Sequence, residues 1–233
     1  MIGMGDAAER SSTRVTGAEL SIPDAAQRED LAGFIGRAVR LDPAVVVRLR
    51  VRPGERTAVE AFAPTPFDAL VTRSAPGTLD PSDVTVVGSD LLAALAVAGG
   101  PSVEPGTSVD ERWRGPLPPL RPDARWQVVG EVPSEVVDGL AEKGVAAARS
   151  GDPSGRPSAA LLDQVVLTVT DEASGLEVRV PMRCVFALSG MGFVGSGVGG
   201  DDVVRVSTDG GWLRLDARGG AVVRRRRAQL PLL

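Results

Sequence analysis

Two segments of the chain alternate between apolar and polar residues, and this alternation restricts the fold more than any other sequence feature. In AVVVRLRVR (44–52), the positions of Val45, Val47 and Leu49 alternate with arginine-bearing positions. The same period of two runs from Leu176 to Leu188, through Cys184 and Phe186. Because successive side chains of a strand point to opposite faces, both segments are predicted to be half-buried β-strands.

Each half of the chain also places an amphipathic helix before its strands. In residues 21–40, Leu31, Phe34 and Ile35 recur at helical spacing, and residues 133–149 repeat this pattern. Neither half shows the regular alternation of strand and helix that is typical of a parallel sheet. We therefore expect an α+β fold of two halves, each a helix plus an antiparallel meander, with mixed or antiparallel sheets.

The composition changes along the chain and suggests where the halves begin and end. Residues 99–124 are rich in glycine and proline and show no period, which is typical of a linker. The expected organisation is a disordered arm (1–16), an N-terminal half (17–98), this linker (99–124), a C-terminal half (125–227) and a tail (228–233).

The residue types that are missing restrict the chemistry. The chain has no histidine and a single cysteine, Cys184, so neither a Ser-His-Asp nor a Cys-His arrangement can form. Cys184 lies on the apolar face of its expected strand, which favours a buried and inert thiol. We expect no metal site, no cofactor and no catalytic residue. The alternative that stays open is an enzyme that acts on a small ligand or depends on carboxylates or a metal, with a site that forms only in three dimensions.

Charge and hydropathy bear on partners and location. The net charge of −4 speaks against a nucleic-acid partner. The longest uncharged run, 184–200, is shorter than the about 20 apolar residues that a membrane-spanning helix needs. We therefore expect a cytoplasmic protein without a membrane span.

A glycine motif follows the second alternating segment. Gly190, Gly192 and Gly195 have the spacing G-x-G-x-x-G of dinucleotide-binding loops. Such loops require a helix directly after the glycines, and the sequence SGVGGDD that follows cannot propagate one. The three glycines are instead interpreted as a β-connection that could contact a partner.

Four consecutive arginines, Arg224, Arg225, Arg226 and Arg227, lie near the end of the chain. They could bind an acidic protein surface or phosphates, or they could be a solvated strand end. Together with the glycines they are the candidate partner-binding residues.

A resemblance covers mainly residues 126–226. The segment LLDQVVLTVTDEASGLEVRVPMRCVFALSGMGFVG, followed by WLRLDARGG, resembles a conserved actinobacterial family that is functionally uncharacterised. The resemblance implies a bacterial cytosolic protein and assigns no activity. We therefore favour a non-enzymatic adaptor or regulator that binds an unknown protein partner, with oligomeric state undetermined.

Overall fold

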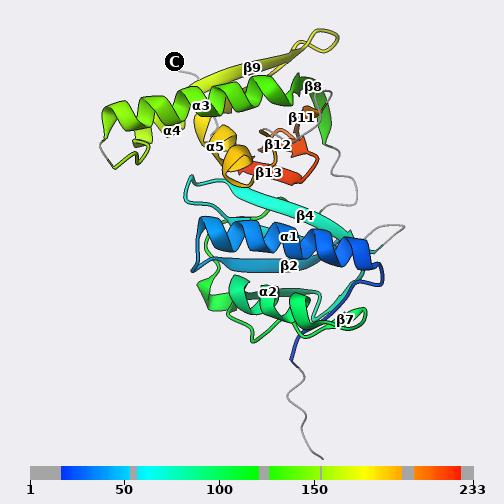
Figure 1. Cartoon of the computed structure of the whole chain (residues 1–233). Helices are drawn as coiled ribbons and strands as arrows, with labels where there is room; N and C mark the ends of the chain where they lie inside the picture. Colours follow the sequence, from blue (N-terminus) through cyan, green and yellow to red (C-terminus); the bar gives the residue numbers. More distant parts are fainter. Residues whose placement is uncertain (1–16, 53–56, 121–125, 153, 196–201, 227–233) are drawn as a thin grey trace, which may run out of the picture.

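The computed structural model describes residues 17–52, 57–120, 126–152, 154–195 and 202–226. The protein consists of helices and antiparallel sheets arranged in two halves, so the predicted α+β class is confirmed (Figure 1). The predicted arm (1–16), the tail (228–233) and Arg227 lie outside the described residues.

The first half is built on helix α1 (Ala25–Leu41), which occupies the segment predicted to be amphipathic. Asp24 caps its start by accepting a hydrogen bond from the Gln27 amide at 3.1 Å. The helix buries Leu31, Phe34 and Ile35 against the sheet beside it. These are the residues that the helical spacing singles out.

The strands of the first half form the predicted meander and a smaller sheet beside it. The meander contains β2 (Val46–Arg52), β3 (Ala58–Pro64) and β4 (Leu70–Pro76), and β6 (Asp83–Val87) pairs with the outer side of β2. The smaller sheet has the order β5-β1-β7 and contains β1 (Glu19–Ser21), β5 (Thr78–Asp80) and β7 (Ser102–Val103). Helix α2 (Gly88–Val97) packs on α1 with one face only, although its sequence is apolar nearly all round.

The second half contains three helices and six strands among the described residues. The helices are α3 (Ser134–Gly151), α4 (Ala159–Asp163) and α5 (Met182–Gly190). The strands are β8 (Gln127–Pro133), β9 (Val165–Asp171), β10 (Leu176–Pro181), β11 (Val203–Thr208), β12 (Trp212–Ala217) and β13 (Gly220–Arg225). Strands β9 and β10 form a separate two-stranded ribbon.

The strand predicted to run from Leu176 to Leu188 is wrong beyond Pro181. The register of β10 shifts at Pro181, whose ring nitrogen has no hydrogen to donate, and helix α5 begins at Met182. Every residue of α5 from Met182 to Leu188 is buried. A segment buried on all sides carries no polar face, so its sequence does not separate a period of two from a helical one.

One sheet connects the two halves. It has eight strands in the order β6-β2-β3-β4-β13-β12-β11-β8, and all neighbours in it are antiparallel. The join is the pairing of β4 with β13, in which Ala221 lies opposite Thr72 and Val222 opposite Val71. One hydrophobic core also extends through both halves.

Part of residues 99–120 contacts the eight-stranded sheet. Strand β7 pairs instead with β1 of the smaller sheet, and the short 3-10 helix η1 (Asp110–Arg112) lies beside β6. The Arg48 guanidinium lies 5.8 Å from the ring centre of Trp113, and the Arg50 guanidinium donates to the Pro118 carbonyl at 3.0 Å. A linker over 99–124 between independent domains stays a prediction. Within the described ranges, no helix combines the length and apolar character needed to span a membrane.

Candidate partner-binding surface

The arginine run lies at the end of β13, where the described part of the chain ends. Arg224 donates to the Asp68 carboxylate at 3.1 Å, and Arg226 donates to the Thr208 hydroxyl at 3.3 Å. Arg225 is exposed, and no hydrogen bond to its side chain is formed within the described residues. We call Arg224, Arg225 and Arg226 the arginine ridge; Arg227 lies outside the described residues.

Two hollows flank the arginine ridge. The ribbon groove, about 690 Å³, lies toward the β9–β10 ribbon and is lined by Asp163, Val165, Glu177, Arg179 and Leu213 besides the ridge. The joint groove, about 1000 Å³, lies where the two halves meet. Its apolar lining consists of Pro64, Pro66, Ala69, Leu70, Pro116, Trp212 and Val223.

The two grooves differ in charge. The ribbon groove has two acidic residues, Asp163 and Glu177, opposite its arginines. The joint groove has a single acidic residue, Asp68, whose carboxylate is already bonded to Arg183 and Arg224. The joint groove therefore combines an apolar lining with a cationic rim formed by Arg114 and the ridge.

Asp68 joins the halves electrostatically, and we call its set of bonds the Asp68 contact. It lies in the β3–β4 loop with φ of 57°, a conformation that is uncommon for residues other than glycine, asparagine and aspartate. Arg183 of α5 donates to the Asp68 carboxylate at 2.9 Å, to the Phe67 carbonyl at 3.1 Å and to Asp163. Arg183 is buried, whereas the Asp68 side chain is 75% exposed.

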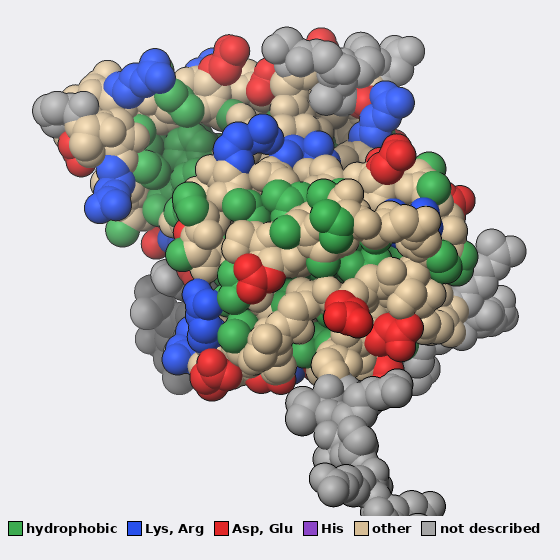
Figure 2. Space-filling view, turned by 60° about the horizontal axis from the view of Figure 1, so that its bottom comes forward, with side chains coloured by type: hydrophobic (Ala, Val, Ile, Leu, Met, Phe, Trp, Pro, Cys, Tyr) green, Lys and Arg blue, Asp and Glu red, His purple; other side chains and the backbone are tan. Residues whose placement is uncertain are grey.

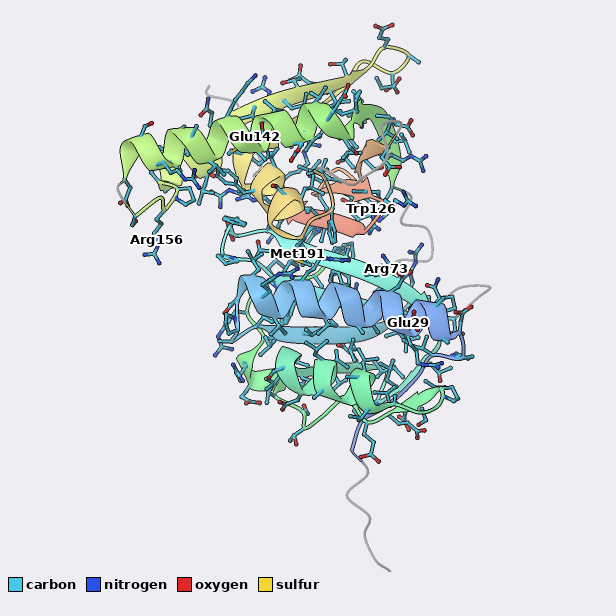
Figure 3. All side chains as sticks on the ribbon, in the orientation of Figure 1. Glu29, Arg73, Trp126, Glu142, Arg156 and Met191 are labelled. Atoms are coloured by element: carbon cyan, nitrogen blue, oxygen red, sulfur yellow. The ribbon has the colours of Figure 1, made fainter. Side chains whose placement is uncertain are left out.

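The glycine motif lies at a second junction between the halves. A Cβ atom on Gly190 would lie 3.3 Å from Leu41 and 3.4 Å from Phe67, and Met191 lies between α5 and α1 (Figure 3). Gly192 has φ of 62° and Gly195 faces Asp138 of α3. Gly190 and Gly192 are exposed, but the residues between and after them are buried. A direct contact of these glycines with a partner stays a prediction.

Phe193 fills this junction, and we call its surroundings the Phe193 contact. Its ring stacks on Phe34 of α1 with the centroids 6.3 Å apart, and the Arg37 guanidinium lies 5.9 Å from the Phe193 centroid. On the other side the ring touches Gly219 and Gly220, where an added Cβ would lie 2.7 Å from ring atoms. The glycines of the β12–β13 turn thus leave the space that the phenyl ring occupies.

The glycine motif lacks the surroundings of a dinucleotide site. It follows helix α5 rather than a strand, and the next element among the described residues is strand β11. A pyrophosphate site of this kind needs a strand, a glycine turn and a helix in that order. The geometry agrees with interpreting the glycines as a connection.

Cys184 is fully buried in α5. Burial in an apolar environment raises the pKa of its thiol to about 12, although the charges of Arg224 and Arg183 oppose the shift. The thiolate, which is the nucleophilic form, is therefore suppressed near neutral pH.

Carboxylates in the loops of the second half have structural partners. Asp202 lies 3.6 Å from the Arg218 guanidinium, and Asp209 accepts bonds from the amides of Gly211 and Trp212. Among the described residues, no three side chains of His, Cys, Asp or Glu gather closely enough to hold a metal ion.

Basic and acidic side chains are interspersed on the face that Figure 2 shows. On α1 the acids Glu29 and Asp30 lie beside Arg28, and Arg37 and Arg40 follow about two and three turns later. This face therefore carries no field of a single sign. The concentration of arginine at the ridge is a local feature.

Two family models cover most of the chain. Residues 15–115 match Domain of unknown function (DUF8010), and residues 121–229 match Domain of unknown function (DUF8185). Each half matches a domain family of unknown function. The predicted resemblance to an uncharacterised family is confirmed, and the actinobacterial origin stays a prediction. No curated protein matches the chain.

The solved structures that are similar to this chain include a DNA polymerase sliding clamp and DNA polymerase III beta subunits. The clamp from Bacillus subtilis aligns with a TM-score of 0.54 at 12% identity, over 93% of this chain. A putative DNA polymerase III beta subunit from Eubacterium rectale aligns with 0.55 at 9% identity, over 92%. The beta subunit from Thermotoga maritima aligns with 0.51 at 13% identity, over 92%. In each case this chain spans 66% of the other chain's length, and the similarity establishes the fold.

Sequence reasoning missed Asp68 and the joint groove. Asp68 and Arg224 form a hydrogen bond although they are 156 positions apart in the sequence, so no local pattern indicates their pairing. One signal was present for the Phe193 contact. A large aromatic residue in a glycine-rich loop gains most from packing, which indicates a junction.

Proposed function

We propose that this chain is a non-enzymatic scaffold that binds a protein partner at the arginine ridge and the two grooves beside it. The proposal is carried by one observation: a fold similar to DNA polymerase sliding clamps extends over more than nine-tenths of the chain. The cytoplasmic location predicted from the sequence is part of this proposal.

The chemistry of the grooves supports a protein segment as the ligand. Arginine side chains form short, charge-assisted hydrogen bonds with carboxylates, and Arg225 has its donors exposed. Exposed Pro66 and Pro116 and half-buried Leu70 line the joint groove with apolar surface next to those donors. Arginine is among the residues in which binding surfaces concentrate their energy. A segment that combines apolar and acidic residues fits this surface.

DNA is the second candidate partner. The similar structures are subunits or clamps of DNA polymerases, so the sequence-based expectation against nucleic acid has lost its support. Arg114 and Arg225 are exposed on the rim of the joint groove and could contact phosphates.

The substitution Arg225→Glu tests the ridge, with Arg156→Glu as the matched control. Arg156 is equally an exposed arginine, but it lies at the outer end of α3, away from β13 (Figure 3). Tagged wild-type protein and both variants would be used to capture proteins from bacterial lysate, with quantitative mass spectrometry of what is retained. Binding of a short DNA duplex would be measured in parallel by fluorescence anisotropy.

The expected result is at least one retained protein that Arg225→Glu loses by about tenfold or more and Arg156→Glu keeps, since reversing one charge in a contact costs on the order of 1.4 kcal/mol or more. Equal retention by the two variants would contradict the proposed surface. DNA binding that only Arg225→Glu weakens, without such a protein, would favour the second candidate.

A further inference from the structure

A proline-rich segment of the chain lies on one face of the eight-stranded sheet. This segment, WRGPLPPL (113–120), has no helix, strand or turn after Gly115, and we call it the strap. Trp113 and Leu117 of the strap pack against a small apolar cluster that is separate from the main core. The cluster is formed by Phe62 of β3, Trp212 of β12 and Val223 of β13.

This cluster lies on the face of the sheet that is turned away from α1. Ala61 belongs to the main core that contains α1, and Phe62, the next residue, belongs to the separate cluster. Successive side chains of a strand point to opposite faces. We call the cluster together with Arg50 of β2, whose guanidinium lies 5.1 Å from the Phe62 ring centre, the strap site.

We propose that the strap site binds a proline-rich segment of a partner protein and that the strap occupies it as an internal ligand of the same kind. The inference adds a second ligand and a second surface to the proposed function. It does not rest on that function, because its test requires no binding at the arginine ridge.

The sequence of the strap restricts its backbone to the conformation of proline-rich ligands. Proline fixes φ near −65°, and a residue that precedes proline is restricted to extended conformations. Leu117 and Pro118 both precede a proline, so the middle of the strap is held in the polyproline II region. A polyproline II segment makes no internal hydrogen bonds, so its carbonyl groups are free to accept bonds from a binding surface.

The strap site has the chemistry that recognises such a segment. Proline-rich ligands dock on surfaces lined by aromatic side chains, which Phe62 and Trp212 supply here. The Arg50 guanidinium donates to the Pro118 carbonyl at 3.0 Å. Pro118 is buried, whereas Pro119 is exposed. The strap therefore binds through one buried proline, one leucine and one carbonyl group.

The strap leaves part of this site unused. Among the described residues, the bond from Arg50 to Pro118 is the one hydrogen bond that joins residues 115–120 to the sheet. The Nε atom of Arg50 is buried and has no hydrogen-bond partner within the described ranges, and Arg50 itself is 8% exposed. The buried hydroxyl of Thr72, which lies opposite Phe62 in β4, is likewise unpaired there. A ligand that bonds to these groups would gain contacts that the strap does not make.

Tethering explains why the strap fills the site in the absence of a partner. A segment joined to its site by a short tether has an effective concentration on the order of millimolar. A proline-rich partner segment must exceed this competition, so only a ligand with additional contacts, or one at high local concentration, displaces the strap. The strap thereby sets a threshold for binding.

Binding of a synthetic peptide to the full chain tests the inference. The probe is fluorescein-labelled RGPLPPL, the sequence of residues 114–120, and its control is RGALAAL, in which alanine replaces each proline. The double substitution Leu117→Ser with Pro118→Ser removes the apolar contacts of the strap. Leu117→Ala is a milder opening. Fluorescence anisotropy would measure affinity, and circular dichroism would show that each variant is folded.

We expect the double variant to bind RGPLPPL at least about tenfold more tightly than the wild type, because its site is no longer filled in cis. Leu117→Ala should lie between the two, and RGALAAL should bind at least about tenfold more weakly than RGPLPPL, since it lacks the restricted backbone. If the double variant does not fold, the comparison of Leu117→Ala with the wild type decides. Equal affinities of wild type and variants, no binding by folded variants, or equal binding of the two peptides would each overturn the inference.

A second pair of variants locates the peptide on the sheet. Arg50→Met combined with Glu60→Gln, in the background of the double variant, removes the donor together with the charge 3.9 Å from it. Affinity for RGPLPPL should fall by about tenfold or more, since the bond comes from a charged donor. Arg52→Met is the matched control, because Arg52 lies on the same face of β2 and its side chain is 58% exposed. Unchanged affinity in the folded Arg50 variant, or equal losses in both, would show that the peptide binds elsewhere.

Discussion

Besides the pairing of β4 with β13, the two halves share side-chain contacts, and two of these differ in chemistry. At the Phe193 contact, a buried ring lies between Phe34 of α1 and the glycines of the β12–β13 turn. At the Asp68 contact, a largely exposed carboxylate bonds to Arg183 and Arg224. Burial of apolar surface stabilises in proportion to the area removed from water, whereas exposed ion pairs contribute little. The comparison indicates that, beside the strand pairing, the apolar contact stabilises the join of the halves more than the polar contact does, and Asp68 of the polar contact lines the joint groove.

Phe193→Ala should have the largest effect. Removing a buried phenyl ring leaves a cavity between the halves and is expected to lower the free energy of unfolding by about 3–5 kcal/mol. Chemical denaturation would measure the loss. Phe67→Ala is the comparison, since Phe67 also lies between the halves, with its centroid 5.5 Å from that of Phe186, but is only partly buried. Equal losses in the free energy of unfolding for the two variants would mean that the Phe193 contact contributes no more to stability than the Phe67 ring does.

Arg183→Met should have an intermediate effect. The buried guanidinium bonds to Asp163, to Asp68 and to the Phe67 carbonyl, and methionine fills a similar volume without donors. Losing hydrogen bonds of a charged group is expected to cost about 1.5–3 kcal/mol. Thermal unfolding would measure it, with Arg179→Met, which alters an exposed ion pair, as the reference. A change no larger than the reference would show that burial adds nothing to this network.

Asp68→Asn should have a small effect on stability. Asparagine tolerates the positive φ at this position but has no charge, and exposed ion pairs contribute less than about 1 kcal/mol. Asp68→Ala removes the same charge and adds backbone strain. The difference between the two variants in denaturation midpoint reports that strain together with the hydrogen-bond acceptor that asparagine keeps. A large loss with Asp68→Asn would reverse the ranking of the two contacts.

Cys184 should not react with maleimide in the folded protein near neutral pH, because burial raises the pKa of its thiol to about 12. The contribution of the protonated Cys184 thiol to the stability of the fold is present below the unfolded-state pKa of about 8.5. This contribution is lost as pH rises from there toward about 12. Maleimide labelling over a pH series would follow this loss. We expect Phe193→Ala to accelerate the labelling of Cys184 at pH 7 and Asp68→Asn to leave it unchanged. Acceleration by both variants would contradict the distinction between the Phe193 contact and the Asp68 contact.

Most of the local structure could be predicted from the sequence, because helices and half-buried strands have their own periods. The β2–β4 meander and helix α3 lie within a few residues of their predicted positions. Helix α5 could not be predicted, since it has no polar face. The pairing of Ala221 with Thr72, on which the joint groove depends, joins distant parts of the chain and leaves no local pattern. The arginine run is evident in the sequence, whereas the pairing of Arg224 with Asp68 is evident only in three dimensions.

The β4–β13 pairing has a consequence for chains that are cut in two. Separated between residues 115 and 126, the halves would expose β4 and β13 as new edge strands, and each of these edges would offer backbone donors and acceptors to the other. Mixed fragments should therefore reassemble into one molecule, as in a complementation assay, and either fragment alone should aggregate. The covalent connection would then serve to keep the halves at equal concentration, while the sheet itself supplies their mutual recognition.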